Sequence, residues 1–195
     1  ITVVDEPAHD VELIAWLRRY WWVAGLLLVL VIGLRWTYLG YSELQGDEAT
    51  VLVRAAKLLE GDESVLFSHK KGPAEILVVA AGWRLTGITN EAMARLPFSW
   101  ANIIGILAAF LIARYALSLH VGVLAVALLG IEGYTLAFAR IAQYQSLVLV
   151  LGTLGLLCAL WFKRTGRSTL VICAALLIAS AALAHYDAVF VLPPK

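Results

Sequence analysis

One stretch decides the fold: residues 20–39, with the sequence YWWVAGLLLVLVIGLRWTYL. It carries a single charged side chain, Arg35, and a helix of about 20 mostly apolar residues is long enough to cross a bilayer. The whole chain of 195 residues is 62% hydrophobic and 15% charged, whereas soluble domains have roughly 25% charged residues. The sequence therefore predicts an all-α membrane protein, a multi-pass helical bundle. The net charge of +1 argues against a nucleic-acid partner.

The apolar segments divide the chain into a tail, a long polar loop and a bundle. Residues 1–19 are expected to form a cytoplasmic tail, and the first transmembrane helix covers residues 20–39. The loop at residues 40–96 has two shorter helices, at about 47–60 and 74–86. The remaining transmembrane helices are expected at about 97–117, 122–139, 146–162 and 169–184, before an outer tail that ends at residue 195. Because the chain starts without Met and stops just after an apolar helix, we expect an N-terminal portion of a longer protein.

Basic residues predict the topology. Lys and Arg favour the cytoplasmic side in short loops. Arg18 and Arg19 precede the first span, and residues 163–167 (KRTGR) form the most basic later loop. The Arg18-Arg19 site and the 163–167 loop are both cytoplasmic only if one of the four apolar segments between residues 40 and 163 does not cross the membrane. That segment is 74–86, because its uncharged part is too short to span a bilayer. The prediction is a protein of the cytoplasmic (inner) cell membrane with a cytoplasmic N-terminus. The helices at 47–60 and 74–86 then lie along the extracytoplasmic surface.

Polar residues from distant segments should meet on that extracytoplasmic surface. Asp47 is the best candidate for a general base that accepts the proton of a hydroxyl nucleophile, with Glu48 beside it. Lys71 and Lys70 can balance the charge on a departing phosphate, and Arg140 can bind two phosphate oxygens. The other candidates on this face are His69, Tyr144, His185, Tyr186 and Asp187.

Each candidate also has a simpler interpretation. The two acids can stabilise the first turn of an interfacial helix, and the lysines can bind anionic headgroups. Arg140 can extend from the end of a span toward water. Glu132 falls inside the span at 122–139, where a carboxylate usually faces the bundle interior or a watery cavity. A pair between Glu132 and Arg35 is a hypothesis, and structural and functional roles for Glu132 both stay open.

The order of motifs along the chain resembles a known family. After the first span come Gly46-Asp47-Glu48-Ala49 and His69-Lys70-Lys71-Gly72-Pro73. Leu85-Thr86-Gly87, Arg95-Leu96-Pro97, and Phe138-Ala139-Arg140 with Gln143-Tyr144 follow. This series resembles the C-type membrane glycosyltransferases, in particular the protein O-mannosyltransferases and the bacterial lipid A aminoarabinose transferase.

The resemblance implies a function and roles for several residues. It implies an inverting glycosyltransferase that uses a polyprenyl-phosphate-linked sugar donor on the periplasmic or lumenal face. Asp47 is then the base, while Lys71 and Arg140 contact the donor phosphate. The acceptor is a protein, a lipid or a glycan, and membrane lipid surrounds the chain. No cofactor is assigned, although an Asp-Glu pair can hold a divalent cation.

Two other functions fit parts of the pattern. A transporter or flippase subunit for a lipid-linked anion would use Lys70, Lys71 and Glu132 along a path through the bilayer. It predicts charges spread through the membrane depth, whereas the sequence gathers most of them at one face. In a non-catalytic membrane scaffold, the acidic and basic cluster would have no chemical role.

Overall fold

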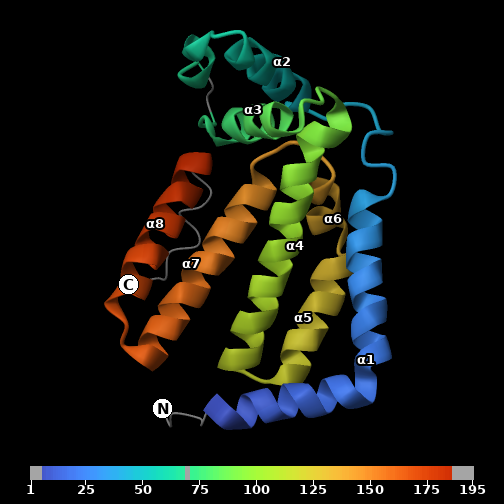
Figure 1. Ribbon diagram of the computed structural model, residues 1–195, viewed down its shortest axis with the longest axis vertical. Helices are drawn as coiled ribbons and strands as arrows, with labels where there is room; N and C mark the ends of the chain where they lie inside the picture. The colour runs from blue at the N-terminus through green and yellow to red at the C-terminus, as the bar shows by residue number, and fades with distance from the viewer. Residues whose placement is uncertain (1–5, 69–70, 186–195) are drawn as a thin grey trace.

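The computed structural model describes residues 6–68 and 71–185, and over these residues the protein is an all-α helical bundle (Figure 1). Within these ranges, three helices are long and apolar enough to cross a membrane, and a bent pair of shorter helices also qualifies if it counts as one span. The chain is therefore a multi-pass membrane protein. The elements are α1 (Glu6–Trp36), α2 (Glu48–Leu59), the 3₁₀ helix η1 (Glu63–Leu66), α3 (Ala74–Thr86), α4 (Glu91–Ala116), α5 (Leu119–Ile131), α6 (Gly133–Ala139), α7 (Gln145–Thr165) and α8 (Ser168–Ala184).

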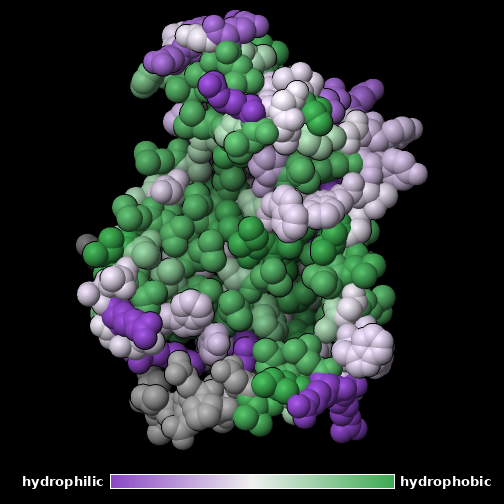
Figure 2. Space-filling view, viewed as in Figure 1, coloured by the Kyte–Doolittle hydropathy of each residue, from purple (hydrophilic) through white to green (hydrophobic). Residues whose placement is uncertain are grey.

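The surface is divided into bands that match a membrane-spanning bundle. Figure 2 shows a broad hydrophobic zone across the middle of the visible face, with hydrophilic residues gathered over its two ends. Many large apolar side chains of the bundle helices are exposed, among them Leu124 and Leu128 of α5 and Leu176 of α8. Exposed apolar patches of this extent mark a surface that contacts lipid or other apolar groups.

The helices α2 and α3 lie across one end of the bundle (Figure 1), which we call the site end. The apolar faces of both helices are buried in a common core that includes Val51 of α2, Ile76 and Val79 of α3, and Phe98 of α4. Gly87 ends α3 in a left-handed conformation with φ of 69°, as a glycine after a helix commonly does. This core fixes the polar loops that flank α2 and α3 above the bundle.

The first helix begins earlier than expected. Residues 6–19 were expected to form a polar tail, but α1 starts at Glu6 and bends at Tyr20, where φ is −124° and ψ is 28°. The part before the bend crosses the end of the bundle opposite the site end (Figure 1). We call that end the basic end, because Arg18, Arg19, Arg114 and Arg164 lie on the segments there.

The expected continuous span at residues 122–139 is broken, because α5 and α6 meet at an angle of 63°. Glu132 lies at the break, and its carboxylate accepts hydrogen bonds from the backbone N–H groups of Tyr134 (2.7 Å) and Thr135 (2.8 Å). It therefore caps the first turn of α6. The sequence pattern had suggested that Glu132 lies inside a continuous helix and faces the bundle interior or a watery cavity. In the structure its side chain is exposed.

The hypothesised pair between Arg35 and Glu132 is wrong. The buried guanidinium of Arg35 donates instead to the carbonyls of Gly130 (2.9 Å) and Leu129 (3.1 Å), and to the side chain of Asn102 (2.8 Å). The last carbonyls of a helix lack intrahelical donors and carry partial negative charge. Arg35 thus supplies hydrogen-bond donors to the last carbonyls of α5, where the chain bends into α6.

Candidate functional site

Two adjacent acids at the start of α2 face different surroundings. Glu48 is fully buried, and its carboxylate forms two parallel hydrogen bonds with the Arg95 guanidinium, from Nε and Nη2, each 2.8 Å. It also accepts from the backbone N–H groups of Ala142 (2.8 Å) and Gln45 (3.2 Å). Four donors leave this carboxylate saturated. A carboxylate in this state cannot serve as a general base, and the geometry does not support the catalytic role expected for Glu48.

Arg95 connects the loop before α2 to the bundle. Its Nη1 donates to the carbonyl of Leu39 (2.8 Å) and to both the carbonyl and the hydroxyl of Ser42, at 3.1 Å and 3.0 Å. Its Nη2 also lies 3.3 Å from the carbonyl of Glu43. Arg95 is fully buried on α4, so this one side chain holds the loop at residues 39–45 in place. Asp47 therefore follows an anchored loop rather than a free one.

Asp47 makes the second ion pair of this region. Its carboxylate pairs with the Lys71 ammonium, although the two residues belong to different segments. The Asp47 side chain is 56% exposed and that of Lys71 is 30% exposed. Asp47 occupies the position before α2 but its side chain does not cap that helix. The acid thus faces the surface and a cation.

Aromatic residues complete the surroundings of Lys71. Its ammonium lies 5.4 Å from the centre of the Tyr144 ring, within the range of a cation–π contact. The Tyr144 ring stacks on His185, with ring centres 3.7 Å apart and planes 7° from parallel. Four segments of the chain thus meet at the site end: the starts of α2, α3 and α7, and the end of α8.

Two buried carboxylates hold the turn that carries Tyr144. Glu75 of α3, only 1% exposed, accepts from the Tyr144 backbone N–H at 2.7 Å. Glu48 accepts from the N–H of Ala142, two residues earlier. The Gln143 side chain donates to the Gln45 carbonyl at 3.2 Å, which ties the same turn to the loop before α2. The orientation of Tyr144 over Lys71 is therefore set by acids on α2 and α3.

Glycine allows α3 to start against the end of α8. Gly72 has φ of 103°, and a Cβ atom built there would lie 2.3 Å from the Leu183 carbonyl oxygen. Only a residue without a side chain fits so close to another backbone. The position next to Lys71 is thus fixed by contact with the last turn of α8.

The other predicted site residues lie apart from this group or outside the described residues. Arg140 donates to the carbonyls of Leu34 (2.7 Å) and Tyr38 (3.4 Å), so its guanidinium is engaged at the end of α1. Glu132 caps α6, as described above. Four predicted residues fall outside the described part of the chain: His69, Lys70, Tyr186 and Asp187.

An apolar groove begins beside the cluster. Tyr144 and Gln145 line its polar end together with Tyr134 of α6, and its volume is about 280 Å³. The groove follows α7 away from the site end along Val148, Leu149, Gly152, Thr153 and Leu156. Within the described part of the chain, the buried Oε1 atom of Gln145 has no hydrogen-bond partner. The groove thus joins a charged surface to the hydrophobic middle of the bundle.

The acidic pair does not act as one metal-binding unit, because Glu48 faces Arg95 and Asp47 faces Lys71. Over residues 6–68 and 71–185, no group of three or more His, Cys, Asp and Glu side chains could hold a metal ion. Sequence reasoning gave no role to Arg95 and overlooked Glu75. Both are charged residues next to apolar helix faces, and that placement is the signal that could have identified them as buried partners.

No protein-family model, curated protein or solved structure matches this chain.

Proposed function

We propose that this chain carries the donor-binding end of an inverting glycosyltransferase that moves a sugar from a polyprenyl-phosphate carrier to an acceptor hydroxyl. The observation that carries the proposal is the exposed Asp47–Lys71 pair, held at one end of a membrane bundle beside an apolar groove. A base, a phosphate-binding cation and a surface for a hydrocarbon chain are the three elements that this reaction needs. The order of motifs, which resembles the C-type membrane glycosyltransferases, supports the same assignment.

The chemistry follows from the two side chains. The acceptor oxygen attacks the anomeric carbon of the sugar while the bond from that carbon to the phosphate oxygen breaks. The hydroxyl proton passes to the Asp47 carboxylate. The lipid phosphate leaves with the bonding electrons, and the Lys71 ammonium stabilises its negative charge. Attack from the face opposite the phosphate inverts the configuration at that carbon.

The exposed ion pair suits an exchange of partners. Exposed pairs contribute only about 0–1 kcal/mol to stability, so a phosphate can take Lys71 from Asp47 at little cost. In this step Asp47 accepts the proton of the acceptor hydroxyl while the phosphate is bound to Lys71. The groove on α7 starts at Tyr144, beside Lys71, and suits the hydrocarbon chain of a donor whose phosphate is bound there. We place this end of the bundle on the extracytoplasmic side, on the basis of the positive-inside rule.

The transporter alternative has less support from the geometry. It would use Glu132 along a path through the membrane, but this carboxylate caps α6 through two backbone hydrogen bonds. Arg35, the other charge within the spans near it, donates to helix carbonyls.

The test is reconstitution of the full-length protein in liposomes with candidate polyprenyl-phosphate sugars, with released polyprenyl phosphate as the readout. We expect Asp47→Asn to lower transfer by about 10²–10⁴-fold, the usual contribution of a general base. Glu60→Gln is the matched control, because it removes an exposed carboxylate from the other end of α2. Unchanged transfer in Asp47→Asn, with normal membrane insertion, would remove Asp47 from the mechanism.

A further inference from the structure

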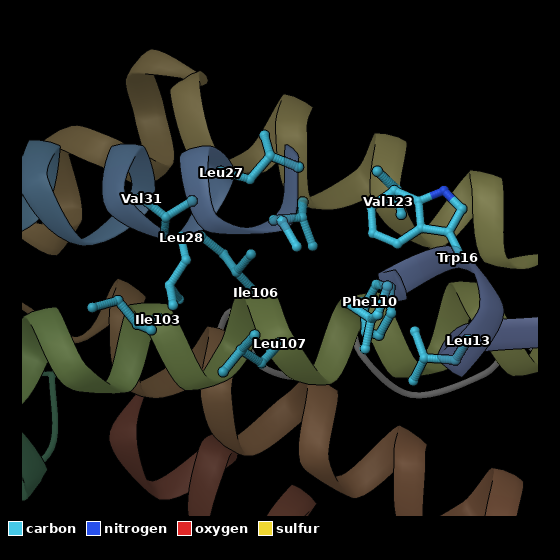
Figure 3. A pocket seen from close by; sticks show the side chains of 13 residues that line it. Leu13, Trp16, Leu27, Leu28, Val31, Ile103, Ile106, Leu107, Phe110 and Val123 are labelled. Atoms are coloured by element: carbon cyan, nitrogen blue, oxygen red, sulfur yellow. The ribbon is translucent and has the colours of Figure 1, made fainter. Parts of the chain in front are cut away.

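A second cavity lies between α1, α4 and α5, away from the Asp47–Lys71 pair. Its volume is about 270 Å³, and all thirteen side chains that line it are apolar. Figure 3 shows Val31 and Leu28 of α1 facing Ile103, Ile106 and Leu107 of α4, with Trp16, Leu13 and Phe110 around the far part. The function proposed above makes no use of this space.

The bend in α1 creates the cavity. In the part of α1 before the bend at Tyr20, Leu13, Trp16 and Leu17 close one side of the space. Toward the site end, α1 packs directly on α4, where Val31, Ile103 and Ile106 form a small buried core. Between these two points the cavity lies between α1 on one side and α4 and α5 on the other. The lining of an empty space loses dispersion contacts, so within a membrane an apolar chain is favoured to fill it.

We propose that this cavity holds one acyl chain of an anionic membrane phospholipid, whose phosphate lies at the basic end of the bundle. Arg18 and Arg19 are exposed and follow directly after Leu17, which lines the cavity. On α4, Arg114 comes one turn after Phe110, another lining residue, but its side chain is buried. The bent segment also carries three acids, Glu6, Asp10 and Glu12, while the end of α7 and the loop after it add Lys163, Arg164 and Arg167 at the same end of the bundle. Basic residues therefore outnumber acidic ones in the described segments at this end. Juxtamembrane arginines of this kind attract anionic headgroups.

The lining of the cavity favours an acyl chain over a polar occupant. A single hydrocarbon chain needs no hydrogen-bond partner, which agrees with a lining that offers only apolar side chains.

The test is native mass spectrometry of the full-length protein, released from membranes of equal parts phosphatidylglycerol and phosphatidylcholine with identical acyl chains. We expect one retained phosphatidylglycerol per chain. Ala24→Phe places a ring in the cavity and should abolish this adduct, while Ala175→Phe on the exposed face of α8 should keep it. Val126→Phe fills the same space from α5 and replaces Ala24→Phe if that variant does not fold.

The headgroup is tested separately. Replacing both Arg18 and Arg19 by Ala should lower the preference for phosphatidylglycerol by roughly 10- to 30-fold, the effect of two basic contacts. Retention of lipid by both cavity-filling variants would overturn the proposal. So would a wild-type protein that retains no phospholipid, or one that retains a polyprenyl lipid displaced by Ala24→Phe. Equal retention of the two phospholipids would overturn the anionic assignment.

Discussion

Asp47 and Glu48 are neighbours in the sequence, yet each pairs with a cation in a different environment. Glu48 and Arg95 have no exposed side-chain surface, whereas Asp47 and Lys71 are both partly open to solvent. Removing one partner of a buried pair leaves an unpaired charge and costs about 3–5 kcal/mol. An exposed pair contributes about 0–1 kcal/mol. The difference separates an ion pair that stabilises the fold from one that contributes little to stability.

The largest effect should come from breaking the buried pair. We expect Arg95→Leu to lower the free energy of unfolding by about 3–5 kcal/mol, because the Glu48 carboxylate stays buried without its cation. The measurement is unfolding in mixed micelles at increasing SDS, followed by circular dichroism. Arg84→Leu is the control, since it removes an exposed arginine from α3 and should change stability by less than about 0.5 kcal/mol. Equal losses in the two variants would contradict the structural role of Arg95.

Breaking the exposed pair should separate activity from stability. We expect Lys71→Ala to lower sugar transfer by about 10²–10³-fold, because a cation at the leaving phosphate is lost. Its free energy of unfolding should change by at most about 1 kcal/mol. Lys57→Ala on α2 removes another exposed lysine and should leave transfer unchanged. A loss of stability as large as that in Arg95→Leu would show that the two pairs do not differ in kind.

The backbone next to Lys71 allows a finer test. Gly72→Ala should destabilise the protein by more than Gly87→Ala, because both positions have positive φ but only Gly72 meets another backbone. The conformational cost shared by the two variants is about 1–2 kcal/mol. The further loss of stability in Gly72→Ala, beyond that in Gly87→Ala, measures the steric clash of the new Cβ atom with the Leu183 carbonyl. Equal midpoints of thermal unfolding in the two variants would mean that α3 does not start against α8 as described.

The smallest effect is expected at the break between α5 and α6. Glu132→Ala removes a helix cap and should cost about 1 kcal/mol, while Glu132→Gln keeps an acceptor and should cost less. Neither variant should alter sugar transfer when the amount of folded protein is matched. A specific loss of transfer in Glu132→Gln would instead restore a functional role for this carboxylate.

Helix positions could be predicted where local signals were strong. Pro73 and Gly87 bracket α3, which has the predicted bounds, and α8 begins one residue before the predicted segment. The break at Glu132 could not be predicted, because an acid between two glycines fits a cavity-facing helix and a helix cap equally well. Residues 6–19 are too polar to suggest that they continue a transmembrane helix. In the structure these residues form the first part of α1, which the bend at Tyr20 separates from the membrane-spanning part.

The sequence predicted only that the candidate residues gather on one surface of the bundle. The structure shows which of their side chains contact one another. Placing Asp47 and Lys71 on one surface followed from the polar loop and the motif order. Asp47 was preferred over Glu48 as the base, but the burial of Glu48 against Arg95 could not be predicted, because Arg95 lies far along the chain. The engagement of Arg140 at the end of α1 depends on helix packing, and no local pattern encodes it.

The contact of Gly72 with the last turn of α8 has a consequence for biosynthesis. Lys71 leaves the ribosome well before Tyr144 and His185, and before the helix end against which Gly72 rests. Until α7 and α8 have been inserted, Lys71 lacks the Tyr144 ring and Gly72 lacks the last turn of α8 as neighbours. The exposed ion pair can therefore reach its final surroundings only near the end of membrane insertion, after every described helix has been made.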